Sequence, residues 1–162
     1  MSLVEEVTRR VARYADRRED WTVFGFETAL DARYARSQRR YIGASGSVDH
    51  ADPHTLEPVA FTMSIQTIPP GNRIPAHCHE TEETFFILDG RCRIQAFRGS
   101  ETASIELNRW DLISIAPHIY HDIHNVGDID CAIQTLLSKA RPERPNYQDP
   151  RLLDLQARTK TC

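Results

Sequence analysis

Residues 77 to 83 read His-Cys-His-Glu-Thr-Glu-Glu, which concentrates metal-ligating side chains in one short segment. In a β-strand, residues i and i+2 point to the same face, so the imidazoles of His77 and His79 point to one place while Cys78 points away. Glu83 opens the next expected strand, across a short turn, and its carboxylate can reach the same point. The segment therefore predicts a site for one divalent metal ion.

A third histidine on a separate strand would complete a set of three imidazoles and one carboxylate, which suits Fe, Mn, Co, Ni or Zn. We assign His121 to this position. A histidine pair at this spacing also occurs without metal, so the pair alone leaves both interpretations open. Glu80 and Glu82 are alternative carboxylates, but their neighbours predict a turn that faces water.

The elements that must position these side chains are mostly strands. Val4, Val7 and Val11 lie at helical spacing and predict an amphipathic helix over residues 3 to 17. From residue 21 onward, short apolar runs alternate with Gly, Pro, Asn and Asp, which is typical of an all-β domain. We expect strands over residues 21–26, 40–43, 59–68, 76–78, 84–88, 92–97, 104–107, 112–115, 121–125 and 132–137.

Turn signals and the number of strands indicate a closed barrel or sandwich. Pro69-Pro70-Gly71 must end a strand, and Leu88-Asp89-Gly90 predicts a tight hairpin. Many short antiparallel strands in one modest domain favour closure, because closure removes sheet edges that would otherwise aggregate. We expect an N-terminal helix within residues 1–20, a barrel over 21–140, and a proline-rich tail over 141–162 that packs on the barrel and includes a short helix near Leu152 to Leu155.

The glycines around the metal-ligating segment make the pattern more specific. Gly71, His77, His79, Glu83 and Gly90 are separated by five, one, three and six residues. This string resembles, position for position, the first signature motif of the cupin superfamily. The resemblance implies a single-domain cupin barrel, also called a double-stranded β-helix or jelly roll, that covers residues 59 to 137 and binds a metal ion.

The second cupin motif is degraded in this sequence. Trp110, Ala116 and His118 stand where the family has glycine, proline and glycine. His121 and Asn125 are both present, however, and the resemblance assigns the third histidine ligand to His121. The departures from the motif put the shape of the loop over residues 116–120 in question.

Several residues near the expected site are candidates for catalysis or substrate binding. His118 and Tyr120 are candidates for proton transfer, although a solvent-facing loop position is the alternative for His118. Gln66, Arg73, Phe85, Ile87 and Gln134 are candidates for lining the substrate site. His124 has the opposite strand parity to His121 and should point away, and His50 and His54 lie in a loop over residues 43–58 that is a candidate lid.

Composition limits the partners. The chain has 162 residues, with 20 Lys and Arg against 23 Asp and Glu, so its net charge of −3 does not indicate a nucleic-acid partner. We find no signal peptide and no run long enough for a membrane span, so we expect a cytoplasmic protein with a small-molecule substrate. Cys78, Cys92, Cys131 and Cys162 form no CxxC pair and are expected to be free thiols.

Four protein ligands leave an octahedral ion two open positions, which favours a reactive site over a closed one. The leading hypothesis is an Fe(II)-dependent dioxygenase acting on a small organic molecule, with Mn, Ni or Zn as alternative metals. The alternatives are a redox-neutral lyase, isomerase or cyclase, and a non-catalytic protein that binds a small ligand. The resemblance also implies a homodimer, in which residues 21–42 could supply an exchanged strand.

Overall fold

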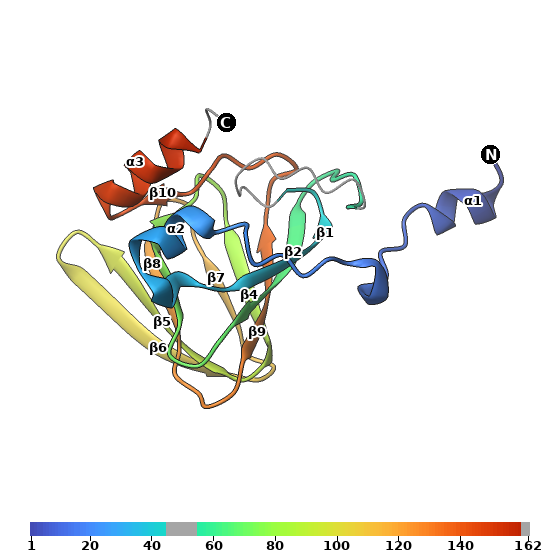
Figure 1. The fold of residues 1–162 in the computed structure, drawn as a ribbon. Coiled ribbons are helices and arrows are strands. Elements are labelled where there is room, and N and C mark those ends of the chain that lie inside the picture. Colours follow the sequence, from blue (N-terminus) through green and yellow to red (C-terminus); the bar gives the residue numbers. More distant parts are fainter. Residues whose placement is uncertain (45–54, 160–162) are drawn as a thin grey trace.

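The computed structural model describes residues 1–44 and 55–159, which form two five-stranded antiparallel sheets that face each other (Figure 1). One sheet has the strand order β1-β2-β9-β4-β7 and the other has the order β10-β3-β8-β5-β6. The expected lid histidines His50 and His54, as well as Cys162, lie outside the described residues. The strands are β1 (Ser37–Ile42), β2 (Thr62–Ile68), β3 (Arg73–Cys78), β4 (Glu83–Asp89), β5 (Arg91–Arg98), β6 (Glu101–Asn108), β7 (Leu112–Ile115), β8 (Tyr120–Asn125), β9 (Cys131–Leu137) and β10 (Asn146–Tyr147).

Alternate residues of β2, β4, β8 and β9 are buried, as expected for strands that turn one face to a common interior. The apolar core draws on both sheets and includes Ile68, Phe85, Ile87, Ile94, Ile123 and Ile133. Polar side chains are buried in the same interior, among them Ser64, Gln66 and Thr135. The all-β cupin-type fold predicted from the sequence is thus confirmed.

A tight turn after β4 carries the chain from one sheet to the other. Gly90, between β4 and β5, has φ +78°, and a Cβ there would lie 2.7 Å from the carbonyl oxygen of Asp130. Only glycine fits such a position, because other residues meet both the unfavourable backbone conformation and this collision. The turn predicted at Leu88-Asp89-Gly90 is present, but the predicted hairpin is wrong. Strand β4 pairs with β7 and β9, whereas β5 pairs with β6 and β8, so this turn joins the two sheets.

Two helices cover one end of the barrel. Helix α2 (Gly25–Leu30) and helix α3 (Pro150–Arg158) contact each other, and both lie beside β10 (Figure 1). Helix α3 begins where Asp149 accepts a hydrogen bond from the backbone N–H of Arg151 and Pro150 occupies the first turn. This confirms the short helix predicted near the C-terminus.

The N-terminal helix is shorter than expected. Helix α1 (Leu3–Thr8) starts with a capping box between Ser2 and Glu5, and a 3-10 turn, η1 (Tyr14–Asp16), follows it. Helix α1 buries none of its residues and lies apart from the barrel in Figure 1. Because none of its residues is buried, local capping is its main support, which explains why it does not extend to residue 17.

The strand expected over residues 21–26 is wrong. The side chain of Asp20 accepts hydrogen bonds from the backbone N–H and the hydroxyl of Thr22, which turns the chain, and Gly25 then opens α2. Val23 and Phe24 are buried all the same. The apolar run therefore packs on the barrel as a turn and helix, and a second 3-10 turn, η2 (Ala32–Tyr34), leads into β1.

Among the described residues, no helix combines the length and the apolar character needed to cross a lipid bilayer.

Candidate metal centre

The pairing of β3 with β8 brings two of the histidines together. His77 on β3 lies opposite His121 on β8, and the register shifts between Ile74 and His77. Pro75 lies within this irregularity, where a residue without an N–H cannot complete the ladder. The chain then continues to His79 and turns, so that Glu83 opens β4.

The side chains of all four predicted ligands converge in the barrel interior. The Nε2 atoms of His77, His79 and His121 lie 3.5, 3.6 and 3.1 Å from Oε2 of Glu83. One potential ligand atom from each of His77, His79 and Glu83 falls within 4.8 Å of the others. All four residues are buried. This group can hold a metal ion through His77, His79 and Glu83, while the role of His121 as a fourth ligand stays a prediction.

Backbone carbonyls orient two of the imidazoles. Nδ1 of His77 lies 2.9 Å from the carbonyl oxygen of Pro75, and Nδ1 of His121 lies 3.0 Å from that of Ile119. A carbonyl oxygen only accepts, so Nδ1 carries the hydrogen in both rings. In the neutral ring this leaves a lone pair on Nε2, which points at Glu83. Such outer hydrogen bonds are the usual support of metal-binding histidines, and the residues therefore fit a metal ion.

The carboxyl group of Glu83 is ionised despite its burial. Burial raises its pKa, but the neighbouring His79, His121 and His77 outweigh burial and hold the pKa well below its usual value. For His77, burial alone would lower the pKa. The hydrogen bond and the negative charge of Glu83 outweigh burial, so the pKa of His77 is raised. The centre thus offers a metal ion one negative ligand among imidazoles.

A small cavity of about 40 Å³ adjoins the metal-ligating residues. His77, His79 and Glu83 form part of its lining, together with the apolar side chains of Ile74 and Phe85. The remaining lining residues come largely from outside the strands that carry the metal ligands. They are Phe24, Phe26, Glu27, Arg36, Gln38, Gln66, Thr135, Pro145, Tyr147 and Gln156.

A buried ion pair forms one wall of this cavity. The guanidinium of Arg36 donates from Nη1 to Oε2 of Glu27 at 2.6 Å and from Nη2 to Oε1 at 3.2 Å. The guanidinium also lies over the ring of Phe24, 3.6 Å from its centroid. Glu27 is 0% exposed and Arg36 is 3% exposed. Desolvating two charges is costly, so the pair needs the further hydrogen bonds that surround it.

Those further bonds connect the pair to the barrel and to the tail. Arg36 donates from Nε to Oε1 of Gln66 at 2.9 Å, and Gln66 donates to the hydroxyl of Thr135 at 3.2 Å. The hydroxyl of Tyr147 donates to Oε1 of Glu27 at 2.6 Å. Burial and the charge of Glu27 raise the pKa of Tyr147 well above its usual value, so the phenol stays protonated. One network therefore runs from α2 through β2 and β9 and out to β10.

The strands that carry these residues match a known protein family. Residues 64–137 match the family model of the cupin domain. The chain thus contains a cupin domain over residues 64–137. This cupin is 28% identical to an uncharacterized protein of Methanocaldococcus jannaschii over 96 residues, which cover 57% of the chain and 74% of that protein.

Solved structures similar to this cupin include oxalate decarboxylases and an oxalate oxidase. The Bacillus subtilis oxalate decarboxylase, which has Mn(II) centres, aligns with a TM-score of 0.57 and 15% identity over 70% of the cupin and 28% of that chain. The Lactobacillus farciminis oxalate decarboxylase in its formate complex aligns with a TM-score of 0.55 and 18% identity, over 67% of the cupin and 33% of that chain. Oxalate oxidase in complex with a substrate analogue, glycolate, aligns with a TM-score of 0.52 and 17% identity, over 55% of the cupin and 46% of that chain. The cupin spans less than half of each of these chains, and the likeness shows the fold alone.

The cupin motif positions that lack glycine keep the backbone conformation of glycine. Trp110 has φ +76° and His118 has φ +64°. His118 is exposed, and its backbone N–H donates to the carbonyl oxygen of His79 at 2.8 Å. Its backbone thus holds the loop beside the metal ligands while its side chain faces solvent.

The residues expected to line a substrate site differ in whether they reach the cavity. Within the described part of the chain, Gln66 and Phe85 line the cavity, whereas Arg73, Ile87 and Gln134 do not. Arg73 pairs with Asp31 at 2.9 Å, and Ile87 is buried in the apolar core. Gln134 lies between the buried residues Ile133 and Thr135 and so belongs to the outer face of β9.

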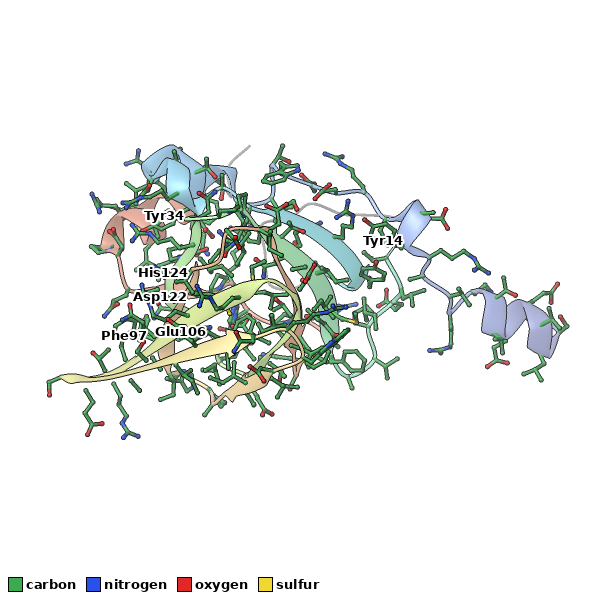
Figure 2. The ribbon with its side chains drawn as sticks, turned by 90° about the horizontal axis from the view of Figure 1, so that it is seen from below. Tyr14, Tyr34, Phe97, Glu106, Asp122 and His124 are labelled. Atoms are coloured by element: carbon green, nitrogen blue, oxygen red, sulfur yellow. The ribbon has the colours of Figure 1, made fainter. Side chains whose placement is uncertain are left out.

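The phenol of Tyr120 accepts a hydrogen bond from the side chain of Asn146 and is only partly buried. The side chain of His124 lies 3.3 Å from Asp122, on the face of β8 opposite His121 (Figure 2). Glu80 contacts Lys139 and the backbone of Glu143, and Glu82 contacts Ser114. These groups lie outside the metal-ligating cluster.

Proposed function

We propose that this cupin is a metal-dependent enzyme that acts on a small organic molecule, with Fe(II)-dependent oxygenation as its reaction class. The observation that carries the proposal is the cluster of buried imidazoles with an ionised carboxylate, which lines a cavity. A structural metal site would be closed on all sides, whereas this one adjoins space for a ligand.

His77, His79, Glu83 and His121 would hold the ion. When bound, a divalent ion supplies Lewis acidity at a coordinated oxygen, and Fe(II) in addition supplies one-electron chemistry with dioxygen. The chain's own residues orient the centre and keep it dry. Pro75 and Ile119 fix two rings through their carbonyl groups, and the side chain of Phe85 excludes water from one side of the cluster.

A redox-neutral lyase, isomerase or cyclase is the second candidate, and the wall of the cavity favours it. The protonated phenol of Tyr147 and the carboxylate of Glu27 lie in that wall, joined by a hydrogen bond. Such groups hold substrate hydroxyl or carbonyl groups in place while a Lewis acid polarises them.

The first test is metal analysis of the protein from its native host, followed by oxygen uptake with candidate substrates. Stoichiometric iron with substrate-dependent uptake supports the oxygenase, whereas zinc or manganese without uptake supports the redox-neutral enzyme. His121→Ala should lose metal, and His124→Ala, on the opposite face of the same strand, is the matched control and should keep it. Ligand binding without turnover across a broad screen would instead favour a binding protein, and no metal in the wild type would refute the proposal.

A further inference from the structure

Helix α1, far from the metal centre, exposes an apolar face to solvent (Figure 1). Leu3 and Val4 are 75% and 74% exposed, and Val7 and Val11 are exposed as well. Val4, Val7 and Val11 are spaced by three and four residues, which places them on one side of a helix. Single exposed apolar residues need no explanation, but a continuous apolar stripe marks an interaction surface.

A second exposed apolar surface lies on the barrel, in a groove of about 640 Å³. Ile42 at the end of β1 lines the groove, and an isolated bridge pairs it with Leu56. The segment that leads into β2 supplies the rest of the apolar lining, and its residue Val59 is 78% exposed. The apolar lining residues from this segment are Leu56, Val59, Ala60 and Phe61.

The apolar face of α1 does not fill the groove of its own chain. The N-terminal arm, defined here as residues 1–11, borders the groove with Met1 and with the charged residues Glu6, Arg9 and Arg10. Within the described part of the chain, Leu3, Val4 and Val7 are not among the residues that line it. The chain therefore carries a helix face and a groove that are both apolar and do not cover each other.

The charges indicate what covers these two surfaces. Residues 1–18 contain five arginines and three acidic residues, so their net charge is +2. Because the whole chain carries −3, residues 19–162 carry −5. Two arms would repel each other, and an anionic lipid surface would repel the rest of the chain. The arm of one copy and the barrel of another attract each other, which favours a second copy as the occupant.

We propose that the arm docks its apolar face into the groove of a second copy, which returns its own arm to the first. Each chain then supplies one helix face and one groove, so the contact is self-complementary, as a two-fold interface must be. It buries Leu3, Val4 and Val7 of one copy against Val59 and Phe61 of the other. Residues 21–42, the other candidate for exchange, contact their own barrel, because β1 pairs with β2 in the same chain. The inference does not depend on a bound metal ion.

Light scattering after size exclusion tests the docking through the mass of the full chain and its variants. We expect the wild type at twice the chain mass. Val4→Asp, Val7→Asp and Val59→Asp should each weaken association by about a hundredfold or more, because each places a charge in an apolar contact. The unfolding free energy of the separated chain should not change, because α1 buries none of its own residues.

Ile129→Asp is the matched control for these variants and should stay dimeric. Ile129 is 53% exposed, but it lies at the far end of β2, where Asn125 donates to both Ile68 and Ile129. A monomeric wild type, or arm and groove variants that associate as the wild type does, overturns the inference.

Cross-linking separates exchange from the other possible occupants. Val7→Cys and Val59→Cys are made in separate Cys162→Ser chains, mixed, and treated with oxidised glutathione. We expect a disulfide that joins the two chains, and none when Ile129→Cys replaces Val59→Cys. A chain that carries both cysteines and cross-links only within itself would show that the arm closes on its own groove. Monomers that sediment with vesicles of phosphatidylglycerol and phosphatidylcholine would assign the arm to a lipid surface, and either result overturns the proposal.

Discussion

Removal of the negative charge of Glu27 should destabilise the protein strongly. In Glu27→Gln, the guanidinium of Arg36 stays buried but loses its counter-charge, and the new amide N–H₂ group faces donors. Breaking a buried pair by neutralising one partner costs about 3 to 5 kcal/mol. For a chain of this length each kcal/mol lowers the melting temperature by about 2 to 4 °C, so we expect a decrease of about 6 to 20 °C.

The assay is urea and thermal unfolding of the metal-free protein, followed by circular dichroism. Glu106→Gln is the control, because Glu106 lies 3.9 Å from Arg91 in an exposed pair that should contribute less than about 1 kcal/mol. The double variant Glu27→Gln/Arg36→Gln should recover about 2 kcal/mol or more relative to the sum of the single variants. If Glu27→Gln costs no more than Glu106→Gln, the reasoning about an enclosed ion pair is refuted.

Four further outcomes are expected. Metal affinity, measured by competition titration at pH 8, 7 and 6, should be highest above the pKa of His77, which is raised above 6.5. Below that pKa, the affinity should fall about tenfold per pH unit for each proton that the ion must displace. An affinity that does not change with pH would contradict histidine ligation. Asn125→Ala should cost about 3 kcal/mol in urea unfolding, since its amide bonds Ile68, Gly127 and Ile129, whereas a cost below about 1 kcal/mol would mean that water replaces these bonds. His118→Gly should raise the unfolding free energy by about 0.5 to 1 kcal/mol by relieving its left-handed backbone, and a decrease would show that the imidazole has a packing role. Deletion of residues 1–9 should change stability by less than about 0.5 kcal/mol, because α1 buries no residue, and light scattering of both forms tests the predicted homodimer: a lost dimer would assign α1 to the partner.

The metal-ligating cluster could be predicted because its spacing follows directly from strand geometry. His77 and His79 share a face by parity, and Glu83 starts the next strand, so a few residues of chain determine their approach. The position of His121 depends on the pairing of β8 with β3, and strand parity alone does not predict such a long-range pairing. The cupin resemblance supplied that position, and the structure places it opposite His77.

The wall of the cavity was beyond this kind of reasoning. The side chains of Arg36, just before β1, and of Gln38, on β1, are buried, although polar side chains are normally expected to face water. Glu27 and Tyr147 come from opposite ends of the chain, where no motif indicates that they meet. Only the contacts of α2 and β10 with the barrel show why these polar groups are stable inside it.

The hydrogen bond between Glu27 and Tyr147 joins positions 120 residues apart. During synthesis, the strands that carry the metal ligands leave the ribosome well before Tyr147 does. Contacts of such long sequence separation form late, because the loop between them must close first. A nascent chain would thus present its metal-ligating histidines before Glu27 gains the hydrogen bond from Tyr147 and before the wall of the cavity is complete.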